Sequence, residues 1–394
     1  MWPGVTYETC NWERNSDELL LIPKSRRRKI LPTYEAAVPA SIAALPVEIP
    51  APLVQRITEV EVSLARFDTA QATRNYALPA LLLRSESSSS SQIERLTSSV
   101  RNVALAELSD KAPANALMVA SNVAAMREAL GQYGEMRIDS ICAIHAVLMR
   151  STGETSRLRK EQVWIGGTPY SPHGATFVPP HANRVQTCLE DLMVFVARED
   201  IPPIVKAAIF HAQFETIHPF TDGNGRTGRA LLHRMLSRDE VLLHTMLPVS
   251  AGLLHDVKRY MNALEAYHDG AIEPIIECLA DALELAVVIG SRITSDVDEI
   301  LAEWSYENTD RASSASHRLP ALLVEQPVVD VAYVASHLGI TERAARNLIE
   351  LACERGILAK VGNAKRGAFY QAPDIIAVLE EASNLQGIRR IAAR

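Results

Sequence analysis

The segment from His218 to Arg229, HPFTDGNGRTGR, gathers more chemically useful side chains than any other part of this chain of 394 residues. It contains an imidazole, a carboxylate, a Gly-Asn-Gly turn and two arginines. An imidazole can accept a proton near neutral pH, and arginine guanidinium groups bind phosphate oxygens in a bidentate manner. The combination indicates a site that holds the phosphates of a nucleotide beside a general base.

The anion-binding part of this segment is the turn Gly223-Asn224-Gly225. Glycines lack a Cβ, so the backbone amides can approach a phosphate closely, and Asn224 adds a side-chain amide donor. Arg226 and Arg229 are three residues apart on the following helix, so both reach the same side of its start. Backbone amides, a side-chain amide and two guanidinium groups therefore face one anion.

Asp222 and His218 supply the remaining groups of the expected site. Asp222 is a hard oxygen ligand placed where Mg²⁺ can bridge phosphates, and His218 can take a proton from an attacking hydroxyl. A Walker loop does not fit, because no GxxxxGK[ST] pattern is present and the segment follows a helix rather than a strand. Zinc held by His211 and His218 is an open alternative, although no HExxH pattern or cysteine partner accompanies them.

The expected helices on either side position these groups. Pro202-Pro203 predicts a helix that runs to about Ile217, and His218-Pro219 ends it. A second helix begins near Asn224, which places residues 222–225 at a helix N-terminus, where exposed N–H groups attract anions.

Other helices are expected around this pair. Helical spacing of apolar residues begins near Pro52, two helices lie within residues 114–149 with a break near 131–135, and helices fill residues 253–304. His145 is expected to be a core histidine. The serine run Ser85–Ser91 fits a helix start better than a helix interior, because serine hydroxyls compete for backbone hydrogen bonds.

The remaining segments are short strands and loops. Residues 162–165 and 175–178 predict a β-hairpin, and residues 1–35, with the basic run 24–29, predict a loosely structured arm. The polar residues 305–318 indicate a linker.

Composition narrows the class of protein. The net charge is −7, so no global field attracts nucleic acid. Five separated cysteines without a CxxC pair suggest neither a disulfide framework nor a zinc ribbon. No apolar stretch is long enough for a membrane helix and no signal core is present, so the expected location is the cytoplasm, with no membrane partner.

The segment 218–229 resembles the signature of the Fic family, enzymes that typically transfer AMP from ATP to a hydroxyl of a protein. The resemblance continues through Phe210–Ile217, Arg159–Gly167 and Val178–Pro180, and with the upstream helices it covers about half of the chain. It implies a mainly α fold, with a Fic-type helical core and a small β-hairpin flap.

The resemblance assigns a role to each residue of the signature. His218 is the general base for a Ser, Thr or Tyr hydroxyl of a target protein, and Asp222 holds Mg²⁺ on the α- and β-phosphates. The turn Gly223-Asn224-Gly225 surrounds the α-phosphate, with Asn224 counted among the catalytic residues. Arg226 and Arg229 bind the outer phosphates of ATP. Strand addition of the target is expected at the flap residues Gly166, Gly167, Thr176, Phe177 and Val178, whose alternative is a surface hairpin without this role.

Ser90–Glu94 resembles the inhibitory-helix motif [S/T]xxxE[G/N] of many Fic proteins, with Arg95 where Gly or Asn is usual. The resemblance implies that Glu94 pairs with Arg229 and keeps this arginine from the γ-phosphate of ATP. The alternative is an exposed helix glutamate without a regulatory role.

Residues 319–376 resemble a winged helix. A helix-turn-helix is expected at 331–338 and 341–354, and wing strands at 357–361 and 368–371. The residues that could contact DNA phosphates are Arg343, Arg346, Lys360, Lys365 and Arg366. Three glutamates on the second helix, Glu342, Glu350 and Glu354, oppose DNA binding, so protein docking or dimerisation stays an alternative.

The resulting division has four parts: an N-terminal helical region with the inhibitory helix (1–104), a Fic catalytic core (105–304), a linker (305–318) and a winged-helix module (319–394). The leading hypothesis is an ATP- and Mg²⁺-dependent protein adenylyltransferase that Glu94 inhibits. Removal of AMP from a target, transfer of another phosphate-containing moiety, and a nucleotide-sensing DNA-binding regulator are alternatives. Self-modification and a homodimer are left open.

Overall fold

The structure is a computed structural model that describes residues 2–12, 30–74, 76–132, 134–153, 157–306, 308, 310–311, 314–362 and 367–393. The basic run 24–29 lies outside the described residues, as do Lys365 and Arg366 of the expected wing. The described chain is mainly helical, with two small antiparallel sheets, which confirms the expected fold class.

The N-terminal arm is more ordered than its sequence predicts. Strands β1 (Thr6–Asn11) and β2 (Thr33–Val38) form an antiparallel hairpin in which Thr6 lies opposite Val38. Ala36 and Ala37 are fully buried, so one end of this hairpin is packed against the rest of the molecule. The prediction of a loose arm was wrong for these strands because their pairing partner lies far along the sequence.

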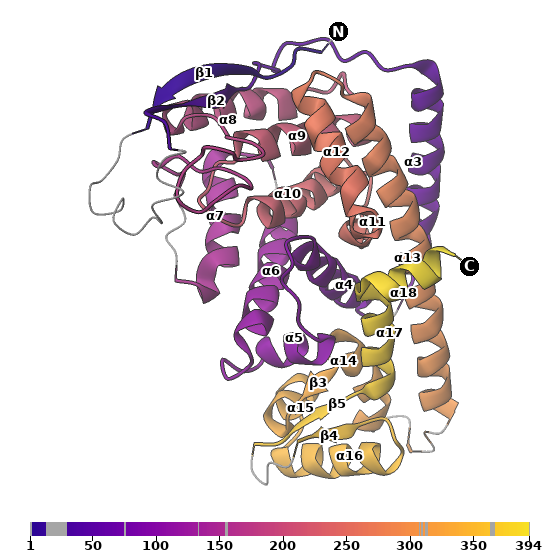
Figure 1. Ribbon diagram of the computed structural model, residues 1–394. Helices are drawn as coiled ribbons and strands as arrows, with labels where there is room; N and C mark the ends of the chain where they lie inside the picture. Colours follow the sequence, from indigo (N-terminus) through magenta and orange to yellow (C-terminus); the bar gives the residue numbers. More distant parts are fainter. Residues whose placement is uncertain are drawn as a thin grey trace.

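A bundle of helices forms the main body of the molecule (Figure 1). At its centre, α10 (Asn224–Arg238) packs against α9 (Pro203–Ile217) and α6 (Ala114–Gly131). The surrounding helices are α3 (Ala51–Gln71), α4 (Leu78–Ile93), α5 (Val100–Ala106), α7 (Ile138–Leu148), α8 (Ala182–Val196), α11 (Val249–His255), α12 (Val257–His268) and α13 (Glu273–Tyr306), with the 3-10 turn η1 at Met149–Ser151. The predicted helices on both sides of His218 are confirmed.

Helix α4 contains the serine run in its buried interior, where the sequence predicted a helix start. The helix begins at Leu78 with Pro79 in its first turn, and Ser85 through Ser91 are all buried. The hydroxyl of Ser91 donates to the carbonyl of Ser87 at 2.8 Å, so the helix itself satisfies one of the polar groups that argued against an interior position. Small side chains also allow the neighbouring helices to approach α4 closely, and tertiary packing outweighs the low helix propensity of serine.

The C-terminal part lies at the opposite end of the molecule from β1 and β2 (Figure 1). It contains η2 (Ala315–His317), α14 (Leu319–Glu325), β3 (Val328–Val329), α15 (Val331–Leu338), α16 (Glu342–Glu354), β4 (Ala359–Val361), β5 (Phe369–Gln371), α17 (Pro373–Ser383) and α18 (Leu385–Ala392). The three strands form an antiparallel sheet in the order β3-β5-β4. Thr341 caps α16 by accepting a hydrogen bond from the amide of Ala344, as its sequence position predicts.

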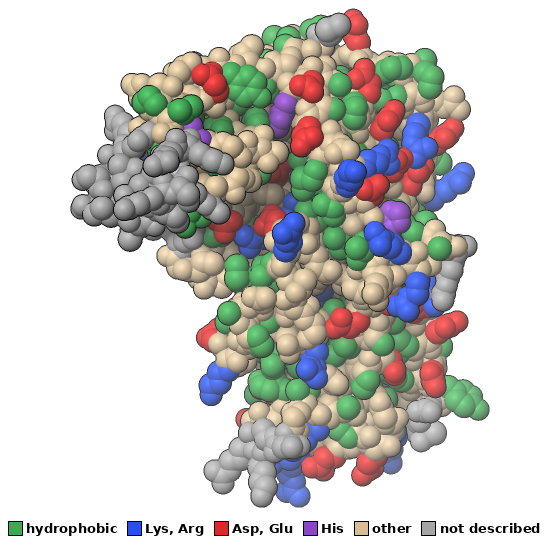
Figure 2. All heavy atoms as spheres, in the orientation of Figure 1, with side chains coloured by type: hydrophobic (Ala, Val, Ile, Leu, Met, Phe, Trp, Pro, Cys, Tyr) green, Lys and Arg blue, Asp and Glu red, His purple; other side chains and the backbone are tan. Residues whose placement is uncertain are grey.

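The surface mixes charges of both signs. Figure 2 shows acidic and basic side chains interspersed over one face of the molecule, which agrees with the modest net charge of −7. Among the described helices, none is both long and apolar enough to cross a membrane.

Candidate functional site

The end of α9 fixes the backbone of His218. This residue adopts the left-handed conformation, with φ of 51°, and its amide donates to the carbonyl of Phe214 at 3.0 Å. The buried guanidinium of Arg159 donates to the carbonyl of His218 at 2.7 Å and to that of Pro180 at 2.5 Å. Arg159 thereby satisfies a carbonyl at the helix end and ties the segment that follows the flap to His218.

The imidazole of His218 is neutral, and one of its nitrogens carries no hydrogen. Its Nδ1 lies 3.3 Å from the carbonyl oxygen of Glu215, so Nδ1 carries the hydrogen in this contact and Nε2 keeps a free lone pair. Burial, together with the positive charge of Arg159, lowers the pKa of His218 to about 4. The ring is therefore neutral at physiological pH, which is the form a general base requires.

The turn after His218 is held by contacts from α7. The Nε2 atom of His145 lies 3.0 Å from the carbonyl oxygen of Asp222, and its ring stacks on Phe220 at a centroid distance of 3.7 Å. Gly223 has a φ of 75°, and a Cβ there would lie 3.0 Å from a methyl group of Leu148. Both the backbone conformation and the space favour glycine at this position. His145 is buried as expected, and it also supports the turn.

The side chain of Asn224 makes two contacts that its place in the motif did not predict. Its Oδ1 accepts from the amide of Phe220 at 2.8 Å, and its Nδ2 donates to the carbonyl of the same residue at 2.9 Å. The side-chain amide thus braces the turn instead of pointing to the anion site. Its expected contact with a phosphate stays a prediction, because a motif specifies residue types but not the direction of each side chain.

Arg226 and Arg229 converge on one carboxylate, that of Glu94. The Nε of Arg226 lies 2.7 Å from one oxygen of Glu94, and the Nη2 of Arg229 lies 2.9 Å from the other. Both arginines are nearly fully buried, at 3% and 2% exposure. The predicted pairing of Glu94 with Arg229 is present, and the pairing with Arg226 was missed. Gly225 makes room for it, since a Cβ there would lie 2.5 Å from Glu94 Oε1.

Helix α4 ends at this contact in a well-defined cap. The amide of Arg95 donates to the carbonyl of Gln92 at 2.9 Å, and the amide of Leu96 donates to that of Ser91 at 3.0 Å. This pair of bonds is a Schellman motif, in which the residue after the cap is left-handed and usually glycine. Arg95 occupies that position with φ of 63°. The departure from Gly or Asn therefore leaves the geometry of the helix end unchanged but adds backbone strain.

Ser90 is the second contact of α4 with Arg229. Its hydroxyl accepts from Nε of Arg229, and its carbonyl accepts from Nη2, both at 2.8 Å. Arg229 is thus held by two residues of α4 that lie one helical turn apart.

A cavity of about 1020 Å³ opens beside these residues. Its walls include His218, Asp222, Gly223, Asn224, Gly225, Arg226, Arg229 and Glu94, with Ile165, Thr176 and Phe177 from the flap and Tyr260, Leu264 and His268 from α12. All the predicted site residues meet here except Gly166, Gly167 and Val178, which do not line the cavity. Its volume is in the usual range for small-molecule sites.

Glu215 is a cavity residue that sequence reasoning missed. Burial raises the pKa of its carboxyl group to about 7, and the nearby charge of Arg229 partly opposes this rise. The position one turn before His218 on α9 was the available signal. The sequence predicted no separate role for Arg159, which is the first residue of the family-like segment Arg159–Gly167. In the structure this residue fixes the backbone of His218.

The flap consists of residues 162–178 and does not contain the two strands that were predicted. Its pairing is limited to isolated bridges, one of which joins Ile165 to Phe177. Gly166 and Gly167 have φ values of 76° and 72°, so the extended backbone ends directly after Ile165. Phe177 stacks on His268 of α12 at 4.1 Å, and the carbonyl of Val178 accepts from the amide of Ala37 in β2 at 3.0 Å. The N-terminal hairpin therefore supports the flap.

Few side chains near the cavity could bind a metal ion. Within the described part of the chain, no group of three or more His, Cys, Asp and Glu side chains is arranged to hold a metal ion. His211, the other candidate zinc ligand, contacts the hydroxyl of Tyr260 at 2.7 Å. Asp222 presents a carboxylate with 55% of its side chain exposed, which fits Mg²⁺ shared with phosphate oxygens better than a protein-enclosed metal.

The segment that contains these residues is similar to known proteins. Residues 135–236 match the Fic/DOC family. This part of the chain is therefore similar to a Fic domain. Protein adenylyltransferase fic-1 of Caenorhabditis elegans is 29% identical over 197 residues, which are 48% of this chain and 36% of that protein. A probable protein adenylyltransferase of Aquifex aeolicus is 36% identical over 104 residues, 25% of this chain and 29% of that protein.

The fold of the chain also has a relative among solved structures. The crystal structure of a Fic family protein from Desulfovibrio desulfuricans G20 superposes with a TM-score of 0.54 at 23% identity, over 83% of this chain and 97% of that one. This likeness concerns the fold alone. The chain spans about a third of the length of the curated relatives that it matches.

Proposed function

We propose that this chain transfers AMP from ATP to a Ser, Thr or Tyr hydroxyl of a target protein, and that Glu94 inhibits the transfer. The observation that carries the proposal is the convergence of Arg226 and Arg229 on Glu94 in the cavity beside His218. Two buried guanidinium groups at a helix start form a binding site for polyphosphate, and here a carboxylate of the same chain occupies it. The names of the curated relatives support the same reaction.

In the proposed reaction, Nε2 of His218 takes the proton of the target hydroxyl. The hydroxyl oxygen then forms a bond to the α-phosphorus, and the bond from this phosphorus to the bridging oxygen breaks, so that pyrophosphate leaves. The hydrogen on Nδ1, directed at the carbonyl of Glu215, keeps the ring in the required tautomer. The backbone amides of Gly223-Asn224-Gly225 stabilise the charge that develops on the α-phosphate.

The arginines and Asp222 bind the rest of the nucleotide. Arg226 and Arg229 would hold the outer phosphate oxygens with the donors that now contact Glu94. Asp222 would hold Mg²⁺, which neutralises phosphate charge during transfer. Most of the catalytic effect then comes from position and electrostatics rather than from covalent chemistry of the protein.

Inhibition follows from competition for the same donors. A γ-phosphate cannot bind Nε of Arg226 and Nη2 of Arg229 while Glu94 accepts hydrogen bonds from both. Each of these is a charge-assisted bond with a buried donor, the stronger kind of hydrogen bond in proteins.

The flap would bind the target segment next to the cavity. Ile165 is exposed at 40% and faces the cavity together with Thr176 and Phe177. A target strand that pairs with the backbone near these residues would bring its hydroxyl to His218.

Transfer of label from ATP carrying ³²P at the α-phosphate tests the proposal, with acceptors supplied by a lysate and by the chain itself. Glu94→Gly should label roughly ten- to a hundredfold more than the natural chain, the range of one charge-assisted hydrogen bond. His218→Ala in the Glu94→Gly background should lower labelling about 10²- to 10⁴-fold, the usual contribution of a general base.

Glu354→Gly is the matched control, because Glu354 is an exposed glutamate at the end of a helix remote from the cavity. It should label like the natural chain. Equal labelling by Glu94→Gly and Glu354→Gly would contradict inhibition by Glu94. Labelling that survives His218→Ala would contradict the general base.

DNA binding by the C-terminal part is a second candidate, favoured by two exposed arginines on α16. Arg343 and Arg346 lie on the outer face of this helix, and Lys360 is exposed on β4. If this face binds DNA phosphates, the natural chain retards duplex DNA in a gel at low salt. Replacing both arginines by alanine should reduce the salt dependence of binding by about two charges. Retardation that is unchanged in the double variant would exclude this face.

A further inference from the structure

Residues of α17 hold both ends of the short segment that carries Glu94. Before Glu94, the side-chain amide of Gln92 donates to the carbonyl of Ser383. After it, the backbone amide of Val100 donates to Oε1 of Glu380 at 2.7 Å. Ser383 and Glu380 both belong to the last turn of α17. The segment 94–99 is therefore fixed at both ends by a helix of the C-terminal part.

These contacts satisfy groups that have no partner within their own helices. Val100 is the first residue of α5, so its amide lacks an intrahelical acceptor, and the final carbonyls of α17 lack intrahelical donors. The hydroxyl of Ser85 in α4 donates to the carbonyl of Ala382 at 3.0 Å. Breaking these contacts leaves partly buried polar groups unpaired, so the contacts oppose movement of α17 away from α4.

The body of α4 is fixed more firmly than its end. The carboxylate of Glu86 is fully buried, 2.7 Å from the amide of Ser250 and 2.8 Å from Nε2 of His233. Withdrawal of the whole helix would expose this cluster or leave it unpaired. Every residue from Leu81 to Ser91 is buried, whereas Glu94 and Arg95, directly after the helix, are exposed. Movement of Glu94 therefore involves the end of α4 and the following segment.

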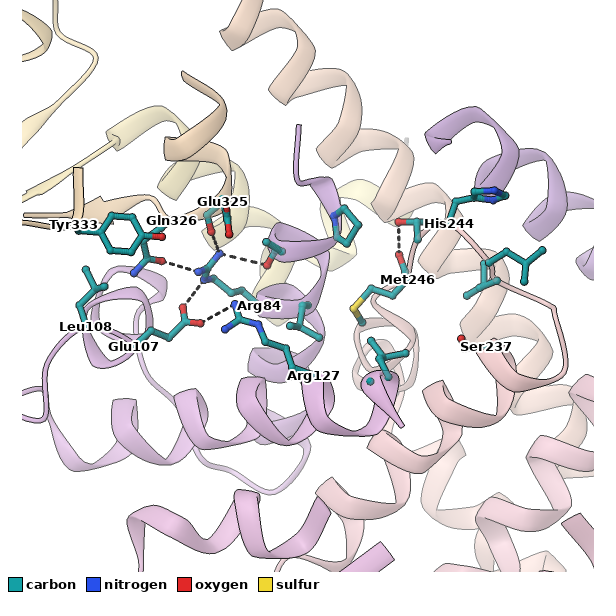
Figure 3. A pocket seen from close by; sticks show the side chains of 18 residues that line it. Arg84, Glu107, Leu108, Arg127, Ser237, His244, Met246, Glu325, Gln326 and Tyr333 are labelled. Atoms are coloured by element: carbon teal, nitrogen blue, oxygen red, sulfur yellow. Dashed lines mark hydrogen bonds and ion pairs between the residues drawn. The ribbon is translucent and has the colours of Figure 1, made fainter. Parts of the chain in front are cut away.

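The first half of α4 is also tied to the C-terminal part. Figure 3 shows Arg84 between Glu107, Gln326 and the carbonyl of Glu325, at the wall of a cavity of about 610 Å³. The corresponding distances are 2.7, 2.6 and 2.5 Å. Gln326 directly follows α14, so Arg84 fixes the start of the C-terminal part to α4. The C-terminal part therefore contacts α4 at two places, through α14 and through α17.

Helix α17 connects these contacts to the small sheet. Strand β5 ends at Gln371 and α17 begins at Pro373, so a single residue separates them. Strand β5 is the central strand of the sheet and pairs with both β3 and β4. The eleven residues of α17 span about 16 Å from the sheet to the segment that carries Glu94. A displacement of the sheet relative to the helical core would be transmitted to that segment.

We propose that Glu380 and Gln92 are positioning residues that hold Glu94 on Arg226 and Arg229, and that the C-terminal part controls nucleotide access through α17. The regulatory half rests on the function proposed above. The positioning half concerns only where Glu94 lies, and it can be measured without nucleotide.

Amide hydrogen exchange of residues 94–100 in the full chain, without nucleotide, tests the positioning half. Glu380→Ala should raise the exchange rate of this segment about two- to tenfold, the range of one net hydrogen bond. Glu380→Gln retains a side-chain oxygen acceptor and should behave like the natural chain. Glu381→Ala is the matched control, because the side chain of this neighbour on α17 pairs with the mostly exposed Arg390, at 3.7 Å.

AMP transfer tests the regulatory half. Glu380→Ala should raise transfer about two- to tenfold when Glu94 is present and should leave it unchanged in the Glu94→Gly background. A variant that merely disturbs the fold would change both backgrounds alike. Gln92→Ala removes the other contact and should have the same pattern, which keeps the test decisive if Glu380→Ala does not fold.

Three results would overturn the inference. One is unchanged exchange in both Glu380→Ala and Gln92→Ala. Another is faster exchange without any gain in transfer when Glu94 is present. The third is an equal gain in the Glu94→Gly background. If Glu94→Gly itself transfers no label, the proposed function fails, and exchange alone still decides whether Glu380 and Gln92 position Glu94.

Discussion

Two segments meet at Arg229, and they are held in place in different ways. The segment 218–229 is short and is braced within itself, as with Asn224 on Phe220, and by the core residues His145 and Arg159. The segment 84–94 of α4 is held by residues far away in the sequence, including Ser250 and Ser383. A turn whose supports lie outside α4 can stay formed while Glu94 moves. The position of Glu94 depends on distant parts of the molecule, which could therefore control the proposed inhibition.

The largest effect is expected where α4 is most deeply held. Glu86→Ala should lower the free energy of unfolding by about 3–5 kcal/mol, because it removes the buried carboxylate that accepts hydrogen bonds from the amide and the hydroxyl of Ser250. Chemical denaturation of the full chain measures this loss. Glu59→Ala, at an exposed position on α3, is the control and should change stability by less than about 0.5 kcal/mol. If the two variants were equally stable, the body of α4 would not be fixed by burial.

A smaller loss is expected in the catalytic turn. Asn224→Ala leaves the amide and carbonyl of Phe220 without their side-chain partner and should lower the free energy of unfolding by about 1–3 kcal/mol. Asn224→Asp keeps the acceptor but loses the donor, so its stability should fall between alanine and the natural residue. Denaturation curves of the three proteins provide the ranking. An aspartate variant no better than alanine would contradict the bracing role.

A substitution directly after α4 should raise the free energy of unfolding instead of lowering it. Arg95→Gly removes the strain of a left-handed arginine and should stabilise the chain by about 1 kcal/mol, with slower amide exchange at residues 94–96. Label transfer should fall, since Glu94 is held more firmly. Arg101→Gly, within helix α5, should instead destabilise by about 1 kcal/mol. A loss of stability in Arg95→Gly would show that the arginine side chain contributes more than its backbone costs.

The smallest expected change concerns protonation. Because burial lowers the pKa of His218 to about 4, its ring should stay neutral as the pH falls from 8 to 5, and it should gain a proton only on further acidification. The ring signal missing from NMR spectra of His218→Ala identifies this residue in a titration of histidine-labelled protein. Titration near the ordinary value of about 6.5 would show that water reaches the ring.

The catalytic turn was predictable because its chemistry and its geometry are both local. The helix that ends at Ile217, the turn at Gly223 and the helix that starts at Asn224 were expected from prolines, glycines and residue types alone. The direction of the Asn224 side chain was not, since two polar contacts to Phe220 decide it. The predicted contact of Glu94 with Arg229 came from resemblance, whereas the contact with Arg226 depends on how α4 crosses α10.

The errors share a cause, which is that long-range partners outweigh local preference. Serines disfavour a helix interior, yet those of α4 lie in the middle of one because neighbouring helices pack closely around them. The arm before residue 35 contains strands because β1 and β2 pair with each other. In the flap, an isolated bridge between Ile165 and Phe177 stands where a regular hairpin was predicted, and Phe177 packs on His268 of α12.

The burial of Arg229 has a consequence for how ATP would activate the protein. Its guanidinium keeps its charge at any physiological pH and is only 2% exposed, so it needs an anion beside it at all times. Glu94 is then a tethered counterion, present at an effective concentration of about millimolar or higher. ATP must exchange with this tethered ligand rather than fill an empty site. Under the proposed function, the degree of inhibition would depend on the effective concentration of one carboxylate and the cellular concentration of ATP, each relative to its own dissociation constant.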